Sequence, residues 1–243
     1  MNPLSKRARL VTALTASAIA FTFTSCESPL SDVEITDPGT LMTTFAVERS
    51  LLNDGTVLNS LQATLLDKNL ASVQLKNGHV KVNGQEMSVA EVLNISTYYV
   101  PSATVDLSTN YEFEIVLANG DSYPGTVTTP AKAFSAVTAP ATGTADSDLT
   151  ISWDAAQVYD EFLISLGLTS PSGTVAGTTF SLTPEQMAAG SFVIPKSSFA
   201  TPAGITSVTV TLMGIDYGTI DSKFRNGSAT VSRMRAEKKI SFN

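Results

Sequence analysis

Residues 73–87 read Val-Gln-Leu-Lys-Asn-Gly-His-Val-Lys-Val-Asn-Gly-Gln-Glu-Met, and this stretch decides the fold class. Two Asn-Gly steps, at residues 77–78 and 83–84, flank a short run in which two valines alternate with polar residues. Asn-Gly supplies the positive φ values that tight hairpins need, and alternation places apolar side chains on one face of a strand. The stretch therefore predicts a β-meander.

The same signals recur along the chain. In residues 111–117 (Tyr-Glu-Phe-Glu-Ile-Val-Leu) the aromatic and aliphatic side chains alternate with two glutamates, and a third Asn-Gly step follows at residues 119–120. Such alternation is typical of a strand with one buried and one wet face. Further short alternating runs lie at 41–48, 61–65, 122–128, 149–154, 162–166, 191–194, 208–212, 229–231 and 239–242. A hydrophobic content of 43% with 15% charged residues excludes wholesale disorder, and the pattern predicts an all-β protein.

Helical signals are confined to one place. Thr183-Pro-Glu-Gln186 matches a capping box with proline at the first helical position, which predicts one helical turn. Thr128-Thr-Pro-Ala131 reads as a strand end followed by a linker. We therefore predict two β-sandwiches in series, over residues 41–130 and 131–243.

The front of the chain predicts export. Basic residues at 6–9 precede an uncharged run over residues 10–23, and small residues lead to Cys26, the single cysteine of the chain. This order matches a signal peptide over residues 1–25, followed by a polar tether over residues 26–40.

Residues 23–26 (Phe-Thr-Ser-Cys) resemble the lipobox of bacterial lipoproteins, in which the cysteine is lipidated and becomes the mature N-terminus. The resemblance implies that Cys26 carries lipid and that the protein is anchored to the membrane, as an outer-membrane lipoprotein of the cell envelope. The alternative is an ordinary secretory signal cut after Ala18 or Ala20, with Cys26 left as a free thiol.

Charge is unevenly distributed. The net charge is −7, and the charged residues among residues 1–25 are all basic, so removal of this segment makes the chain more acidic. Nucleic acid is therefore not an expected partner. Basic residues are concentrated from Lys223 to the C-terminus. We expect them to protect an exposed edge strand; the alternative is contact with anionic lipopolysaccharide or phospholipid.

Catalytic and metal-binding signals are sparse. His79 is the single histidine, beside a predicted hairpin turn, and there is no Gly-x-Ser-x-Gly elbow, so we expect no enzyme and no cofactor. Zinc, copper and iron sites need several imidazoles or thiolates, and this chain has one histidine and one cysteine, so we do not expect those metals. Calcium needs only oxygen ligands, and Asp146 and Asp148 are the first candidates for it. Other acidic residues that could contribute are Asp154, Asp160 with Glu161, and Asp216 with Asp221.

Tyr98 and Tyr99 are the candidates for ligand binding. As neighbours on a predicted strand they face opposite sides, so one ring faces the core and the other could stack on a sugar or a partner. The alternative is a partly buried tyrosine at a sheet edge.

Residues 149–154 (Leu-Thr-Ile-Ser-Trp-Asp) are similar to an early strand of fibronectin type III and related immunoglobulin-like modules, in which a tryptophan packs between the sheets. Residues 107–113 are similar to the tyrosine corner of such folds, with Tyr111 as the tyrosine. The first segment looks like the immunoglobulin-like repeats of Gram-negative cell-envelope lipoproteins. These resemblances imply tandem immunoglobulin-like sandwiches.

The sequence therefore predicts a lipid-anchored envelope protein with a non-enzymatic role in adhesion, scaffolding or accessory binding, whose partner is an envelope protein or a glycan. A carbohydrate- or polymer-binding lipoprotein of a nutrient-uptake system is the alternative, and a glycan-acting hydrolase is a third.

Overall fold

The computed structural model of the protein describes residues 34–92, 95–154, 158–200 and 204–243. Strands dominate these residues and form three sheets packed as sandwiches, which confirms the predicted all-β class. The predicted signal peptide and Cys26 lie outside the described residues.

The largest sheet, here called the long sheet, has the strand order β13-β12-β15-β17-β1-β2-β6-β5, with β10 paired to the end of β17. Its strands are β1 (Met42–Leu51), β2 (Val57–Leu66), β5 (Ser88–Val92), β6 (Ile95–Tyr99), β10 (Thr142–Gly143), β12 (Glu161–Ser170), β13 (Gly173–Ser181), β15 (Ser207–Tyr217) and β17 (Ala229–Phe242).

Two small sheets complete the layers. The first small sheet has the order β16-β8-β7-β3-β4, and the second has the order β14-β11-β9. Their strands are β3 (His79–Val82), β4 (Gln85–Glu86), β7 (Asn110–Val116), β8 (Ser122–Thr128), β9 (Val137–Thr138), β11 (Leu149–Trp153), β14 (Ser191–Ile194) and β16 (Thr219–Ile220). The described residues also form three short helices, η1 (Pro38–Thr40), α2 (Pro184–Ala188) and η2 (Lys196–Phe199).

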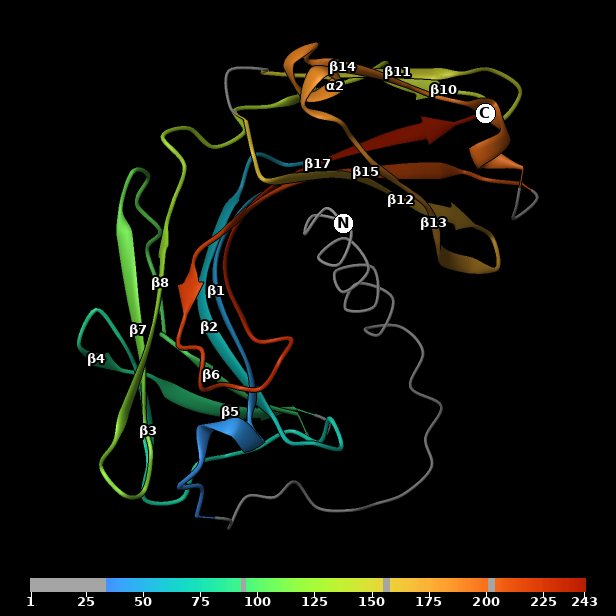
Figure 1. Ribbon diagram of the computed structural model, residues 1–243. Helices are drawn as coiled ribbons and strands as arrows, with labels where there is room; N and C mark the ends of the chain where they lie inside the picture. The colour runs from blue at the N-terminus through green and yellow to red at the C-terminus, as the bar shows by residue number, and fades with distance from the viewer. Residues whose placement is uncertain (1–33, 93–94, 155–157, 201–203) are drawn as a thin grey trace, which may run out of the picture.

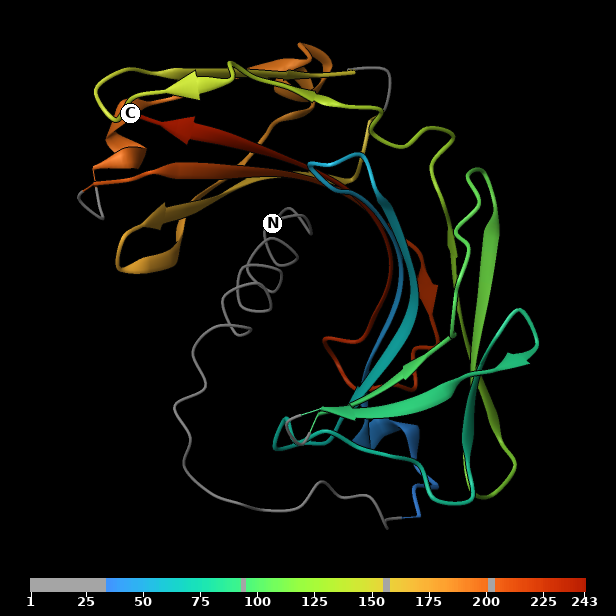
Figure 2. The ribbon, with the colours of Figure 1, turned by 180° about the vertical axis from the view of Figure 1, so that it is seen from behind.

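Both small sheets pack against the convex side of the curved long sheet, one toward each end (Figures 1 and 2). At one end the Phe45 ring on β1 stacks on Phe113 of the first small sheet, with centroids 4.8 Å apart. At the other end Trp153 of the second small sheet stacks on Phe162 of β12 at 5.2 Å. A single cluster of buried apolar side chains includes both contacts, so the core is continuous.

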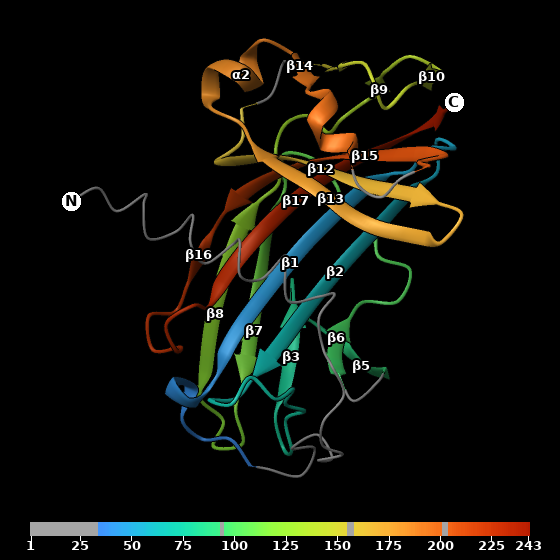
Figure 3. The ribbon, with the colours of Figure 1, turned by 90° about the vertical axis from the view of Figure 1, so that its right-hand side faces the viewer.

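Strand β17 belongs to both sandwiches. Its first half pairs in parallel with β1, from Thr44↔Ala229 to Leu51↔Ala236, and its residues 231–241 pair with β15 (Figure 3). Hydrogen bonds of the long sheet therefore join residues on the two sides of residue 130. The division of the chain into two domains at that residue stays a prediction.

The long final strand also corrects the expectation of a basic edge strand at the C-terminus. Strand β17 lies in the middle of the long sheet, between β15 and β1. Met234, Ala236 and Ile240 on its convex face are fully buried. The arginines point to the opposite, concave face, where Arg235 forms ion pairs with Glu48 at 3.1 Å and Glu237 at 3.4 Å. Counter-charges from the neighbouring strand β1 and from β17 itself thus allow basic residues on a central strand.

The predicted meander is a hairpin instead. Asn77, Asn83 and Gly84 have the positive φ values expected of their turns, and β3 pairs with β4 and β7. The segment before Asn77 is not a strand, although Leu75 is buried. The Leu75 N–H donates to the Tyr98 hydroxyl (2.7 Å) rather than to the backbone of a neighbouring strand.

Two local predictions are confirmed. Thr183 caps α2: its side chain accepts from the Gln186 N–H, and the Gln186 side chain accepts from the Thr183 N–H in return. Trp153 points inward, is 8% exposed, and packs between the long sheet and the second small sheet.

Candidate functional site

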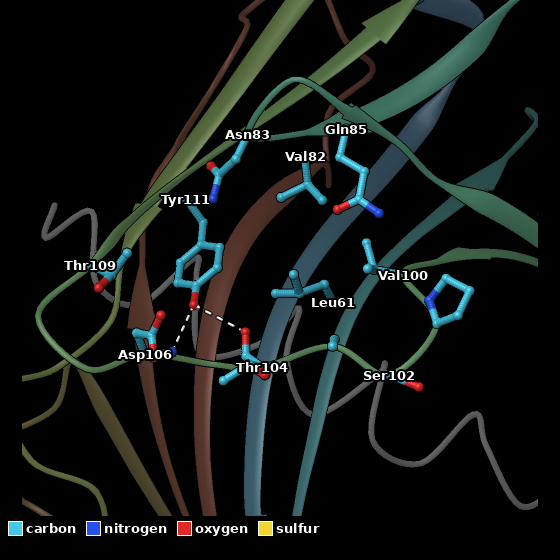
Figure 4. A pocket seen from close by; sticks show the side chains of 12 residues that line it. Leu61, Val82, Asn83, Gln85, Val100, Ser102, Thr104, Asp106, Thr109 and Tyr111 are labelled. Atoms are coloured by element: carbon cyan, nitrogen blue, oxygen red, sulfur yellow. Dashed lines mark hydrogen bonds between the residues drawn. The ribbon is translucent and has the colours of Figure 1, made fainter.

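A polar hollow of about 340 Å³ opens between the β3–β4 turn and the segment 100–109 that connects β6 to β7 (Figure 4). Its apolar wall is formed by Leu61, Val82 and Val100. Its remaining lining is Asn83, Gln85, Pro101, Ser102, Ala103, Thr104, Asp106, Thr109 and Tyr111. The hollow therefore offers amide, hydroxyl and carboxylate groups beside a small apolar surface.

Tyr111 fixes the backbone of this segment. Its ring is buried, and its hydroxyl accepts from the Asp106 N–H (2.8 Å) and donates to the Thr104 carbonyl at 3.5 Å (Figure 4). This is the tyrosine-corner arrangement, in which a strand tyrosine binds backbone a few residues upstream. The resemblance at Tyr111 is borne out in geometry.

Two further side chains hold the same segment. Thr129 Oγ1 donates to the Asp106 carbonyl (2.7 Å), and the Thr109 N–H donates to that hydroxyl at 3.0 Å. Arg49 Nη1 donates to the Val105 carbonyl at 3.4 Å. Because these bonds come from β7, from β1 and from Thr129 just past the end of β8, the polar groups of the hollow sit on a backbone fixed before any partner arrives.

We expect Tyr111→Phe to lower the free energy of unfolding by about 1–2 kcal/mol, because the change removes two hydrogen bonds and leaves the Asp106 N–H without its acceptor. Urea denaturation followed by circular dichroism measures the effect. The matched control is Tyr99→Phe, on a half-buried ring, with an expected change within about 0.5 kcal/mol. Equal stability of wild type and Tyr111→Phe would contradict the role of the hydroxyl.

The structure separates the two tyrosines proposed for ligand binding. Tyr98 is 3% exposed, and its hydroxyl accepts from the Leu75 N–H, so it is a core residue. Tyr99 is half-buried and pairs with Gln62 of β2 and Ser88 of β5. Neither tyrosine lines the hollow, although the next residue, Val100, does. Ligand binding through Tyr99 stays a prediction.

The calcium candidates are exposed. Asp148 Oδ1 accepts from the Lys196 N–H at 2.8 Å, a bond that ties the start of η2 to β11. In the described part of the chain, no three His, Cys, Asp or Glu side chains gather in a group that could hold a metal ion. Asp146 and Asp148 therefore have no third carboxylate beside them, and calcium binding there stays a prediction.

A different pair of carboxylates lies close together at the end of β15. The Asp160 N–H donates to Asp216 Oδ1 (3.3 Å), and the Tyr217 N–H donates to Asp160 Oδ2 (2.8 Å). Burial raises the pKa of Asp216 to about 6; the bond from the Asp160 N–H opposes this rise, and the Asp160 charge adds to it.

This pKa predicts a pH-dependent stability. Between pH 3.8, the ordinary pKa of the group, and about pH 6, the folded state binds the Asp216 proton more tightly than the unfolded state does. The free energy of unfolding therefore falls as pH rises through that window. Asp216→Asn, measured with EDTA present, should therefore be more stable than wild type at pH 7 by about 1–2 kcal/mol, allowing for partial exposure. The gap should close near pH 4. Denaturation curves across pH measure it, and a constant gap would contradict the prediction.

Comparisons with protein-family models and with curated proteins found no match. Among solved structures, the FN1–FN3 domains of chicken CNTN1 match at TM-score 0.27 and 10% identity, covering 90% of this chain and 67% of that one. The adhesin InvE of Yersinia pseudotuberculosis matches at TM-score 0.23 and 12% identity, covering 84% and 60%. Likenesses this weak do not bear on function. No helix among the described residues is long and apolar enough to cross a membrane.

Proposed function

We propose that this chain is a lipid-anchored protein of the cell envelope, held at the outer membrane through Cys26, and that it acts as a non-enzymatic adhesion, scaffold or accessory binding module. The hollow is the observation that supports the binding role. It is lined by Gln85, Ser102 and Asp106, and Tyr111 and Thr129 hold the backbone at Asp106 in place. Preorganised polar groups bind a partner without first losing conformational entropy.

The continuous long sheet supports the scaffold part of the proposal. The hollow adjoins β2 through Leu61, and β2 is joined through β1 and β17 to the strands at the far end of the molecule. A partner held at the hollow is therefore connected by uninterrupted backbone hydrogen bonding to the opposite sandwich. Such a platform keeps a bound partner at a fixed distance from the far end of the long sheet.

A non-enzymatic role fits the chemistry of the hollow. Glycan hydrolysis uses two carboxyl groups on opposite sides of the scissile bond. The lining of the hollow contains one carboxylate, Asp106. The Asp160–Asp216 pair lies elsewhere, and each of these carboxylates accepts a backbone N–H from the other strand.

Carbohydrate or polymer binding is the second candidate, and the mixture of groups in the hollow favours it. Sugar hydroxyls pair with amide, hydroxyl and carboxylate groups, and Gln85, Ser102 and Asp106 supply one of each. The apolar side chains beside them suit the C–H face of a sugar ring.

Replacement of Cys26 tests the anchor. Cys26→Ser should move the protein from the membrane fraction to the soluble fraction, because two or more acyl chains are what holds such a protein stably. Mass spectrometry of the wild-type N-terminal peptide should show the acylated cysteine. An unmodified thiol, or unchanged fractionation of the variant, would refute the anchor.

Binding through the hollow is tested with the double variant Gln85→Ala/Asp106→Ala. We expect it to bind whole cells or purified envelope polysaccharides at least about tenfold more weakly than wild type, because both changes remove hydrogen-bonding groups. Glu91→Ala, at an exposed position on edge strand β5, is the matched control. Equal binding by all three proteins would exclude the hollow as the binding site.

A further inference from the structure

The end of β15 brings four oxygen-bearing side chains to one place, here called the seam cluster: Tyr159, Asp160, Asp216 and Ser232. Asp160 and Asp216 are joined by the bonds described above. Ser232 on β17 is the Cα partner of Asp216 in the β15–β17 ladder, so the two side chains share a face. The Tyr159 ring lies over Gly214, two residues before Asp216 on that same face.

Two members of the seam cluster have buried hydroxyls without a protein partner. Ser232 is 1% exposed and Tyr159 is 4% exposed, and neither hydroxyl makes a hydrogen bond within the described residues. An unpaired buried hydroxyl costs about 1–3 kcal/mol, so native proteins normally satisfy it with water or an ion.

The cluster sits where the two sandwiches meet. Strand β17 contacts β8 of the first small sheet and β9 of the second small sheet, and β15 also contacts β8. Phe134, in the connection between β8 and β9, packs on the Tyr159 ring with centroids 5.6 Å apart. A ligand held here would therefore touch elements of both halves of the molecule.

We propose that the seam cluster binds a calcium ion. Two carboxylates and two hydroxyls form an all-oxygen set that suits a hard cation, and the cluster contains no imidazole or thiolate that would favour zinc or copper. One oxygen of each carboxylate is engaged by a backbone N–H, and the second oxygen of each is assigned to the ion. Asp160 is exposed, so water reaches the site and completes the coordination shell.

Charge supports the same assignment. Asp160 and Asp216 are neighbouring acidic residues joined through the Asp160 N–H, and Asp216 is partly buried. A divalent cation bound between them would neutralise both carboxylates.

The test is a calcium titration of the full-length protein after treatment with EDTA. Thermal unfolding at pH 7 should shift upward by about 5–10 °C when calcium reaches about a hundred times its Kd. Terbium, which replaces calcium on oxygen ligands, should luminesce on excitation of tyrosine because the Tyr159 ring adjoins the site. Excess EDTA should reverse both signals.

Three variants make the result decisive. Asp216→Asn should fold at least as well as wild type in EDTA yet lose the calcium shift, so a failure to fold does not confuse the result. Tyr159→Phe should lose most of the terbium signal. Asp146→Asn is the matched control for an exposed acidic loop and should respond as wild type does.

The opposite results overturn the proposal. No calcium shift in wild type would mean that buried water alone satisfies Tyr159 and Ser232. A shift that persists in Asp216→Asn, or that disappears in Asp146→Asn, would place the ion away from the seam cluster. None of these outcomes depends on the hollow or on the lipid anchor, so the proposed function is tested separately.

Discussion

A fragment comprising residues 34–130 is expected to be unfolded in isolation, although it contains every strand of the predicted first sandwich. The fragment lacks β17, whose first half fills the position beside β1 in the long sheet. Without β17, one side of β1 loses its hydrogen-bond partners, and the core loses Met234 and Ala236, which are fully buried. The loss of a central strand opens the middle of the sheet.

Nuclear magnetic resonance of the ¹⁵N-labelled fragment tests whether the fragment is folded. We expect amide signals collapsed into the narrow range of an unfolded chain, and dispersed signals for the whole protein. A synthetic peptide of residues 219–243, added to the fragment, should restore part of the dispersion because it supplies β16 and β17. A well-dispersed spectrum of the fragment alone would show that the first sandwich folds independently.

The second large effect is expected at Phe45. Phe45→Ala should lower the free energy of unfolding by about 3–5 kcal/mol, the range for removal of a fully buried aromatic ring. The ring stacks on Phe113 and fills the space above Gly125, where a Cβ atom would come within 2.7 Å of it. Its removal leaves a cavity between the long sheet and the first small sheet.

Chemical denaturation compares this variant with Leu58→Ala on the neighbouring strand β2. Leu58 is 52% exposed, so its truncation should cost less than about 1 kcal/mol. Similar losses for the two variants would mean that the Phe45–Phe113 contact does not support the core. The same curves show whether both sandwiches unfold in one transition, as the shared strand β17 predicts.

Local features of the fold could be predicted from sequence because they depend on neighbouring residues. The positive φ values of Asn77 and Asn83, the cap at Thr183 and the inward side of Trp153 all follow from short-range chemistry or two-residue alternation. The segment before Asn77 was wrongly predicted as a strand. Its partner, the Tyr98 hydroxyl, comes from more than twenty positions away, and alternation carries no information on such contacts.

The place of β17 could not be predicted for a related reason. Pairing of Thr44 with Ala229 joins residues near opposite ends of the chain, and nothing in either segment specifies the other. A signal did exist in the alternation of polar and apolar residues over residues 233–242, which is broken only at Lys238 and is longer than an edge strand requires. The basic residues obscured it, because lysine and arginine usually mark exposed edges.

The candidate sites were only partly visible in the sequence. Tyr111 was identified through its resemblance to a tyrosine corner, but the hollow combines residues near 61, 82–85 and 100–111, which only the fold brings together. The seam cluster likewise draws on β15, on β17 and on the residues just before β12. Asp160 and Asp216 can be recognised in the sequence as acidic residues. Ser232 cannot be singled out in this way, because what distinguishes it is a buried hydroxyl without a hydrogen-bond partner among the described residues, and only the fold shows this.

The parallel pairing of β1 with β17 has a mechanical consequence. If the protein is tethered through residues before β1 and pulled through its C-terminus, the two strands are drawn past each other along their length. Every hydrogen bond of the ladder then bears the load simultaneously instead of breaking one after another. We expect single-molecule stretching between these two points to require a markedly higher rupture force than stretching that peels β13 from its sheet edge.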